Sequence, residues 1–359
     1  MKYVRWFDEI GKDDISSVGG KAANLGEMVN AGFPVPPGFA ITIDAFEEFL
    51  ESAKKRGKKA HIARIISKVD PKDTGELEKV SILVRDIVES TPVPEHIEEE
   101  IVRAYEKLCN HVGYENIPVA VRSSATAEDV PDASFAGQQD TYLWIRGKDS
   151  VVRHVVRCWS SLYTPRAIAY RATKGFDHYE VSIAVVVQKM VNSRSSGVMF
   201  TLNPANGDVS QIVIESSWGL GEAIVSGEVT PDRFAVDKVM GEIVERTVSP
   251  KTRWCVFRED GGVVYQDVPE EMQQKPSLDD HEVKELARIG KKIEEHYSIP
   301  MDIEWAIDRD FEFPESIFIL QCRPETVWSK RKKEPVIKAK SGFDLIMSRA
   351  TTTIKLKKS

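Results

Sequence analysis

The sequence has few cysteines, no long apolar run and no excess of basic residues. Its four cysteines, Cys109, Cys158, Cys255 and Cys322, lie far apart and form no CxxC pair. This spacing predicts neither a zinc site nor a disulfide framework, and it fits a reducing compartment. No apolar stretch reaches the roughly 20 residues of a membrane span. The net charge of −7 argues against nucleic acid as the main partner, because that role normally shows a basic excess.

The amino-terminal residues do not have the pattern of a signal peptide. They read MKYVRWFDEIGKDD and become acidic before any apolar core, whereas a secretory signal has a basic start followed by an apolar run. We therefore expect a cytoplasmic protein with no membrane partner. With 359 residues, 42% of them hydrophobic, the chain can bury one large core or two smaller ones.

The stretch from Val119 to Trp144 is the one around which the chain is organised. The sequence predicts a short apolar strand that ends at Arg122 and is followed by residues with hydroxyl side chains. A loop of small residues that includes Gly137 then leads to a return strand at Thr141. Arg binds phosphate oxygens through two donors at once, and small residues let backbone N–H groups approach the same oxygens. The alternative is a polar hairpin in which Arg122 pairs with Glu128 or Asp129.

A second candidate for anion binding is the Gly-Gly-Lys run that ends at Lys21. It opens an apolar-periodic segment, so the spacing predicts a lysine at a helix N-terminus, where dipole, free N–H groups and ammonium all favour an anion. It is not a Walker A loop, because Ala22 stands where Ser or Thr is needed and Ile15 stands at the first Gly. Taken alone, the run could equally be a Gly-rich turn with a solvated lysine.

Two strands near the end of the chain carry a possible metal site. Alternation places Asp302 and Glu304 on one face of a strand over 301–307, and Gln321 and Arg323 on one face of a strand over 316–326. If the strands pair, two carboxylates, an amide oxygen and a guanidinium meet. Hard oxygen ligands of this kind suit Mg²⁺ that bridges nucleotide phosphates. The alternative is a salt-bridged strand pair in which Asp302 or Glu304 contacts Arg323.

The rest of the chain supplies a framework. Apolar periodicity predicts three helices between residues 44 and 108, a helix over 151–174 broken near Pro165, and a helix around 283–293. The arginines of the 151–174 helix, Arg171 among them, are expected to be solvated. Residues 182–191 form an apolar strand too continuous for an exposed edge. The basic start of residues 329–359 predicts a linker or a disordered end.

These motifs, taken together, resemble the nucleotide-binding domain of the phosphoenolpyruvate synthase (pyruvate, water dikinase) family. Related domains occur in pyruvate phosphate dikinase and rifampin phosphotransferase. The resemblance rests on GGKAANL, on VRSSATAED followed by SFAGQQ, on QKMV, on ESSWGLGEAIVSGEVTPD, and on DIEW with QCRPET. It covers roughly residues 3 to 328. The connection over 308–315 is longer than is usual in the family.

The resemblance implies an α+β protein with the ATP-grasp fold, in which two lobes hold ATP and Mg²⁺ between them. The lobes would span residues 1–180 and 181–328, with a tail at 329–359. Catalysis would involve Lys21, Arg122 and Arg323. The nucleotide would also contact Gly137, Thr141, Gln188, Met190, Val191, Glu304 and Gln321. The metal would be held by Asp302, Glu304 and Gln321.

In this family ATP, pyruvate and water give AMP, phosphate and phosphoenolpyruvate by way of a phosphohistidine. None of the seven histidines here lies in a TxxGGxxxH context, and no length remains for a pyruvate-binding barrel. We therefore expect the phosphohistidine domain and the barrel to be partners on another chain. The alternatives are the ATP module of another dikinase or of a rifampin phosphotransferase-like enzyme, and a nucleotide-binding regulatory subunit without turnover.

Overall fold

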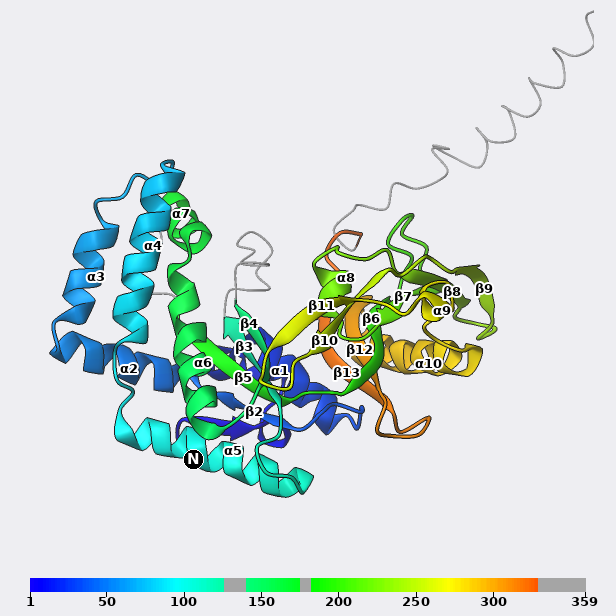
Figure 1. Cartoon of the computed structure of the whole chain (residues 1–359), viewed down its shortest axis with the longest axis horizontal. Helices are drawn as coiled ribbons and strands as arrows, with labels where there is room; N and C mark the ends of the chain where they lie inside the picture. Colours follow the sequence, from blue (N-terminus) through cyan, green and yellow to red (C-terminus); the bar gives the residue numbers. More distant parts are fainter. Residues whose placement is uncertain (126–139, 175–181, 329–359) are drawn as a thin grey trace, which may run out of the picture. The chain divides into compact units, whose positions relative to one another are not determined.

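A computed structural model describes residues 1–125, 140–174 and 182–328 (Figure 1). The chain divides into two compact units, Met1–Glu325 and Thr326–Ser359, and only residues 326–328 of the second are described. The first unit contains two large sheets, a two-stranded hairpin and all the described helices. Within the described residues, no helix is long and apolar enough to cross a membrane.

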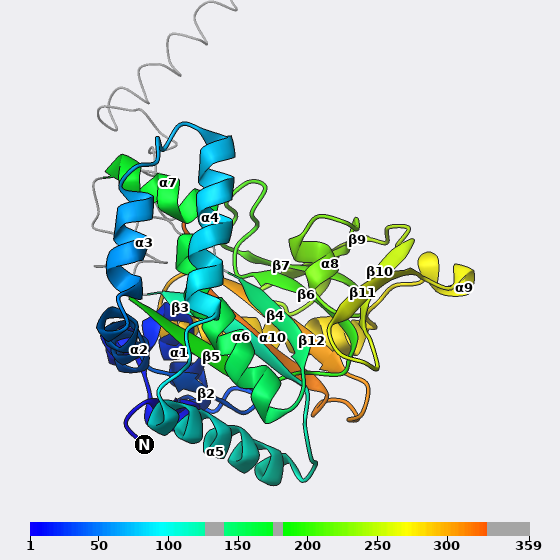
Figure 2. The same cartoon turned by 60° about the vertical axis from the view of Figure 1, so that its left-hand side comes forward.

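The first sheet has five strands in the order β1-β2-β5-β3-β4, and every neighbouring pair is antiparallel. One face is covered by helices α2, α4, α5 and α6, whose apolar sides form a single core with the strands (Figures 1 and 2). The sheet strands are β1 (Val4–Trp6), β2 (Gly38–Ile41), β3 (Val119–Ala125), β4 (Thr141–Ile145) and β5 (Ile183–Lys189). The helices of this half are α2 (Ile43–Lys55), α3 (Lys58–Ile66), α4 (Thr74–Glu89), α5 (Glu95–Val112), α6 (Lys148–Ser160) and α7 (Pro165–Lys174).

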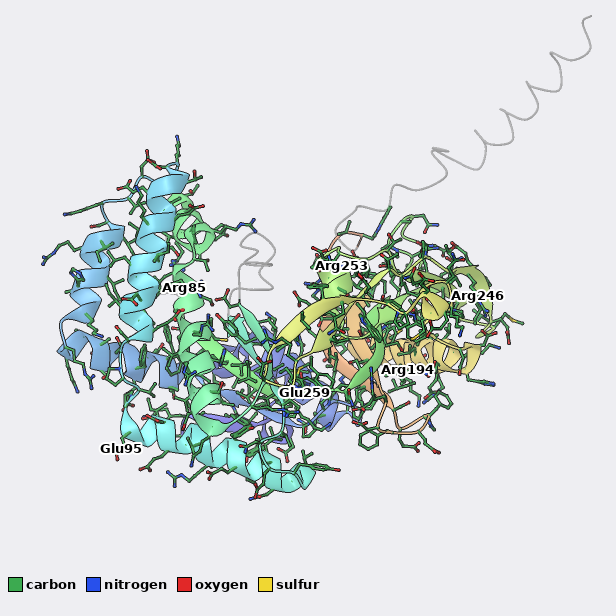
Figure 3. The ribbon with its side chains drawn as sticks, in the orientation of Figure 1. Arg85, Glu95, Arg194, Arg246, Arg253 and Glu259 are labelled. Carbon is green, nitrogen blue, oxygen red and sulfur yellow. The ribbon has the colours of Figure 1, made fainter. Side chains whose placement is uncertain are left out.

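The second sheet has six strands in the order β13-β12-β6-β7-β8-β9, again all antiparallel. Helix α10 (Asp280–Tyr297) packs on one face, and Arg194 Nη2 donates to both carboxylate oxygens of Glu282 on that helix at 2.7 and 2.8 Å (Figure 3). Strands β12 and β13 of this sheet carry Glu304 and Gln321, which belong to the site described below. The strands are β6 (Ser193–Phe200), β7 (Gln211–Trp218), β8 (Asp232–Asp237), β9 (Ile243–Thr247), β12 (Met301–Asp308) and β13 (Ile317–Pro324).

Helix α1 (Ile15–Asn30) and one β-hairpin make packing contacts with both sheets. The buried side of α1 shares a core with Ala40 and Val186 of the first sheet and with residues of the second. The hairpin of β10 (Arg253–Phe257) and β11 (Val263–Asp267) extends from the second half, and its Phe257 ring stacks on Trp144 with centroids 4.1 Å apart. Two short helices, α8 (Glu222–Val225) and α9 (Glu270–Gln273), flank the hairpin in sequence.

Three sequence-based expectations about the framework are wrong. The boundary at residue 181 is too early, because β5 lies between β2 and β3 at the centre of the first sheet; the chain enters the second sheet only after Lys189. Four helices, not three, lie between residues 43 and 112, because α3 is an additional helix between α2 and α4. Arg171 is fully buried rather than solvated, and burial lowers its pKa to about 10.

Candidate functional site

Arg122 lies at the centre of the site and joins the two sheets. It belongs to β3, and its Nη2 donates to the side-chain oxygen of Gln321 at 2.6 Å and to Glu304 Oε2 at 3.2 Å, both on the second sheet. Its Nη1 donates a longer bond of 3.4 Å to the Leu320 carbonyl. The buried Nε–H has no hydrogen-bond partner within the described ranges. The guanidinium therefore bridges the sheets and retains donor capacity for another acceptor.

The two carboxyl-terminal strands pair as expected, and their register brings the predicted ligands together. Glu304 lies opposite Gln321, and Asp302 lies opposite Arg323. Glu304 and Gln321 both accept hydrogen bonds from the Arg122 guanidinium. Asp302 and Arg323 form an ion pair, in which Nε and Nη2 of Arg323 lie 2.8 and 2.7 Å from Asp302 Oδ2. The salt-bridge alternative is therefore present for Asp302, whereas Glu304 contacts Arg122 instead of Arg323.

Lys21 lies in α1, directly after an interruption of the helix. The helix begins at Ile15, earlier than expected, but Gly19 has φ of 74° and ψ of 167°, outside the helical region. Lys21 is thus in the first turn of the segment that follows the break, which is the position that the Gly-Gly-Lys spacing predicts. Its charge acts on the Cys158 thiol, whose pKa is raised by burial and lowered in part by Lys21. Cys158 Sγ lies 3.7 Å from the Val121 carbonyl, next to Arg122 in β3.

A cavity of about 150 Å³ lies beside Arg122. Its lining includes six of the predicted residues: Arg122, Thr141, Gln188, Met190, Val191 and Glu304. Apolar side chains of Leu143, Leu220 and Val225 complete the wall. Among the described residues, Lys21, Asp302, Gln321 and Arg323 are not part of this lining, and Gly137, Glu128 and Asp129 fall outside the described ranges. An apolar cavity next to paired charges suits a purine ring with phosphates.

A larger cavity lies elsewhere but lacks the same chemistry. It has a volume of about 620 Å³ and opens between α5 and the start of α6. Its charged lining is balanced, with three acidic residues against three basic ones: Glu106, Glu115 and Asp149, then Arg146, Lys148 and Arg153. None of the predicted site residues lies there. We therefore take the smaller cavity as the candidate site.

Glu222 is a site residue that the sequence analysis did not single out. It is the first residue of α8 and lines the cavity. Its pKa is raised by burial and by the charge of Glu304, and Arg122 opposes the shift. A second carboxyl, Glu215 on β7, shares a row of the sheet with Val198 and Glu304 and also has a raised pKa because it is buried. The signal for Glu222 was its place within the ESSWGLGEAIVSGEVTPD run, but nothing in that run distinguishes it from Glu215 or Glu228.

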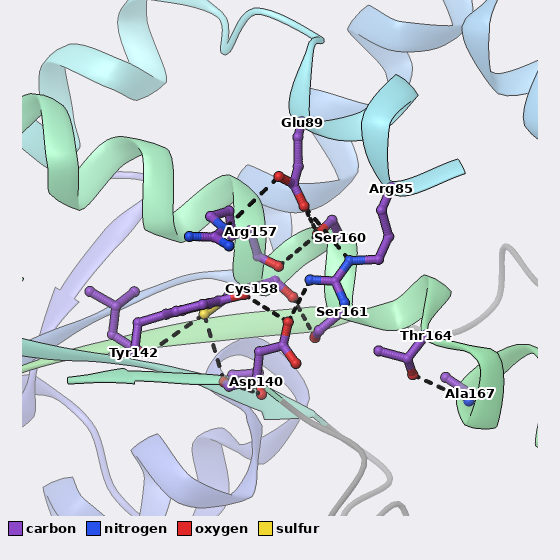
Figure 4. A network of polar contacts seen from close by, with 12 residues as sticks. Arg85, Glu89, Asp140, Tyr142, Arg157, Cys158, Ser160, Ser161, Thr164 and Ala167 are labelled. Carbon is purple, nitrogen blue, oxygen red and sulfur yellow. Dashed lines mark hydrogen bonds and ion pairs between the residues drawn. The ribbon is translucent and has the colours of Figure 1, made fainter. Parts of the chain in front are cut away.

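A polar network fixes the start of β4 (Figure 4). Asp140 accepts hydrogen bonds of 2.7 Å from Arg85 and from the Tyr142 hydroxyl through the same Oδ2. Its carbonyl also accepts a bond from the Ser123 hydroxyl at 3.3 Å. Arg85 lies on α4, so a helix of the first core holds the strand ends beside Arg122 in place.

Comparison with known families identifies the family of this chain. The family described as "Pyruvate phosphate dikinase, AMP/ATP-binding domain" matches residues 15–342. The chain belongs to this family. The match continues past Trp328, so the expectation that the resemblance ends at that residue is wrong.

Three relatives of this chain are archaeal proteins. A "Probable phosphoenolpyruvate synthase" of Archaeoglobus fulgidus is 50% identical over 331 residues, which are 92% of this chain and 42% of the relative. A protein of the same name from Methanocaldococcus jannaschii is 48% identical over 334 residues, 93% of this chain and 27% of the relative. The "Phosphoenolpyruvate synthase" of Aeropyrum pernix is 48% identical over 358 residues, which are 93% of this chain and 43% of the relative. The chain thus spans less than half the length of these relatives.

Proposed function

We propose that this chain binds Mg·ATP between its two sheets, in an ATP-grasp arrangement, and transfers its pyrophosphoryl group as the nucleotide module of a phosphoenolpyruvate synthase. The observation that carries the proposal is the convergence on Arg122. The predicted phosphate-binding cation contacts both Glu304, 182 positions away, and Gln321, 199 positions away. Two motifs that the sequence analysis assigned separately to phosphate and to metal thus belong to one site.

The charged groups of this site pair with one another, and a ligand that carries both charges can replace each partner. Arg122 and Glu304 are mostly buried, with side-chain exposures of 13% and 27%. Separating such a pair without replacement is costly, because each charge would lose its partner in a poorly solvated place. Mg·ATP supplies both replacements at once, since its phosphates suit the guanidinium and its metal suits the carboxylate. Phosphoryl transfer depends mainly on such placement and charge neutralisation.

The donor set fits magnesium better than a transition metal. Glu304 and Gln321 offer oxygens from opposing positions of β12 and β13, and Mg²⁺ is commonly held by one or two carboxylates together with substrate phosphates. No group of three or more His, Cys, Asp or Glu suited to a metal occurs within residues 1–125, 140–174 and 182–328. Glu304 and Gln321 would therefore hold Mg²⁺ jointly with the nucleotide. Asp302 would join them only by leaving Arg323. When bound, the metal would neutralise charge on the phosphates.

The remaining predicted residues take their roles from position. Met190 and Val191 follow β5 and line the cavity, where backbone groups at the strand end can meet the edge of the adenine ring. Gln188 is buried beside them, and its amide donates 3.4 Å to the Pro36 carbonyl. Lys21 would add a cation to the phosphates from the start of the second segment of α1. Arg323, half-exposed and paired with Asp302, would clamp the terminal phosphates at the mouth of the site.

Two experiments test the proposal in sequence. Mg·ATP at millimolar concentration should raise the melting temperature of this chain in proportion to occupancy, whereas Mg²⁺ with pyrophosphate alone should raise it less because the apolar cavity stays unused. No shift with Mg·ATP would contradict nucleotide binding. The product then distinguishes the alternatives: AMP indicates a dikinase module, ADP indicates an ordinary kinase-like member, and tight binding without any product indicates a regulatory subunit.

A further inference from the structure

The break in α1 is occupied by the hydroxyl of Ser124 from β3. In an uninterrupted helix the Ala22 N–H would donate to the Val18 carbonyl, four residues earlier. Here Ser124 Oγ lies between them: it accepts from the Ala22 N–H at 3.3 Å and donates to the Val18 carbonyl at 2.9 Å. A hydroxyl can do both, because it has one donor and two acceptor lone pairs. A side chain inserted into the helical ladder in this way bends the helix.

The approach of α1 to β3 at this point requires glycine. Gly19 has a φ of 74°, a conformation that disfavours a side chain. A Cβ at Gly19 would also lie 2.2 Å from the Ser124 carbonyl oxygen and 2.5 Å from its Oγ. Ser124 itself is 0% exposed, so water cannot take over either hydrogen bond. Gly19 and Ser124 therefore form a single close contact between the Gly-Gly-Lys run and the Arg-Ser-Ser run.

This contact relates the two predicted phosphate cations to one another. Lys21 precedes Ala22, whose N–H is held by Ser124. Arg122 precedes Ser124 by two residues in β3, so their side chains leave the same face of the strand. The hydroxyl thus ties the backbone that carries Lys21 to the strand face that carries Arg122, across 102 positions of sequence.

We infer that Ser124 is a positioning residue for phosphate binding, acting through Lys21. The inference rests on the proposed function, because it requires Lys21 to contact the phosphates of Mg·ATP. Loss of the hydroxyl has two possible outcomes for the Val18 carbonyl and the Ala22 N–H. They either lose a partner in a buried place or bond to each other by straightening the helix. In both cases the Lys21 ammonium moves relative to Arg122, and phosphate binding through two cations is sensitive to such displacement.

A double-mutant cycle tests this dependence. The dissociation constant of Mg·ATP is measured by calorimetry for the unaltered chain, Lys21→Ala, Ser124→Ala and the double variant. If Ser124 acts through Lys21, each single substitution weakens binding about tenfold, and the double variant binds no more than about twofold more weakly than Lys21→Ala. A hydroxyl with only a structural role would give losses that multiply, to about a hundredfold in the double variant.

Tyr105→Phe provides a matched control. Its buried hydroxyl has the same pattern of bonds, accepting from the Gly147 N–H at 3.0 Å and donating to the Ile117 carbonyl at 2.8 Å, but it does not line the candidate site. This variant should lose stability to a similar degree while its dissociation constant for Mg·ATP stays within about twofold of the unaltered value. If Ser124→Ala does not fold, Ser124→Cys replaces it in the cycle, since a thiol keeps the shape and is a weaker donor and acceptor.

The outcomes separate this inference from the proposed function. An unaltered chain that does not bind Mg·ATP overturns both. Binding with multiplying losses in the cycle, or an affinity of Ser124→Ala within about twofold of the unaltered chain, overturns the inference and leaves the proposed function standing. An affinity loss in Tyr105→Phe as large as that in Ser124→Ala also overturns it, because general destabilisation would then explain the effect.

Discussion

The side-chain oxygen of Gln321 accepts a 2.6 Å hydrogen bond from Arg122 on the opposite sheet. Because this acceptor is neutral, the bond orients the guanidinium without cancelling its charge. Only Glu304, at 3.2 Å, opposes that charge directly within the described part of the chain. The site therefore holds a fixed cation whose single ion pair can be exchanged for a phosphate.

Arg122→Lys should weaken Mg·ATP binding by about tenfold or more although the charge is kept. An ammonium is a point charge on a flexible stem and cannot hold Gln321, Glu304 and a phosphate in the planar arrangement of a guanidinium. Calorimetric titration measures the change. Arg194→Lys is the control, since Arg194 pairs with Glu282 on α10 and does not line the candidate cavity. Equal affinity in Arg122→Lys and the unaltered chain would remove Arg122 from the phosphate site.

The features of this site that depend on single strands and turns could be predicted from the sequence. Alternation along 301–307 and 316–326 placed the side chains on their faces, and the observed register, with Glu304 opposite Gln321, follows because one face of each strand must be buried. The turn conformation at Gly19 could likewise be expected before Lys21, since glycine adopts positive φ at little cost.

The contacts between distant segments of the chain could not be predicted from the sequence. Nothing in β3 indicates that Arg122 meets β12 and β13 rather than Glu128 or Asp129, because this depends on how α1 and the two sheets pack. The place of β5 in the first sheet was missed for the same reason: an apolar strand pairs with either sheet equally well as judged by pattern. Arg171 was expected in solvent, since a buried arginine has no sequence signal of its own.

Glu304→Gln should reduce the dependence of nucleotide binding on magnesium more than it reduces stability. The amide keeps the size of the side chain and an oxygen donor, but it removes the charge that attracts the metal. The ratio of ATP affinities with and without Mg²⁺ should fall several-fold, as measured by titration in buffer with and without EDTA. Glu245→Gln is the control, because Glu245 is an exposed ion-pair partner of Arg233. An unchanged ratio with a large loss of stability would instead support a purely structural ion pair with Arg122.

Glu222→Gln should make the protein more stable at neutral pH. Burial and the charge of Glu304 raise the pKa of Glu222 above 4.5 in the folded chain. The folded state therefore holds a proton that the unfolded state has released, and stability falls as pH rises from about 4.5 through the raised value. The variant lacks this loss, so its advantage in urea unfolding should be small near pH 4 and larger at pH 7.

Asp14→Asn is the control with the opposite sign. A hydrogen bond from Arg5 lowers the pKa of Asp14 below 3.8. Its contribution to stability is present above pH 3.8 and is lost as pH falls through the lowered value. Asp14→Asn should therefore be less stable than the unaltered chain at pH 7, and the difference should shrink in acid. The Asp14→Asn difference should thus change below pH 3.8, whereas the Glu222→Gln advantage should grow between pH 4 and pH 7; no growth of that advantage would mean that the assignment of Glu222 is wrong.

Phe257→Ala should destabilise the first unit by about 2 kcal/mol, because it removes a stacked aromatic pair together with buried apolar area. The Phe257 and Trp144 rings are nearly parallel, at 9°, and the Gly262 N–H donates 3.3 Å to the Trp144 carbonyl in the same contact. Urea unfolding measures the loss. Phe311→Ala, at a ring that is 50% exposed, should cost less than half as much. Equal losses would mean that the hairpin contributes little by stacking on β4.

The most discriminating prediction concerns the acceptor of the transferred group. Incubated alone with Mg·ATP, this chain should leave the nucleotide almost intact, because water is a poor substitute for a histidine acceptor. With a separately expressed phosphohistidine domain of a relative, AMP should accumulate, as read by mass spectrometry. Lys21→Ala, Arg122→Ala and Arg323→Ala should each lower the rate by about 10²-fold or more, since each removes a cation from a site where charge neutralisation is most of the catalysis. Arg246→Ala, at an exposed ion pair with Asp280, should leave the rate within about twofold, because surface changes outside a site rarely matter. ADP as the main product would contradict the dikinase assignment, and no product with any histidine domain, despite tight binding, would replace it with a regulatory role.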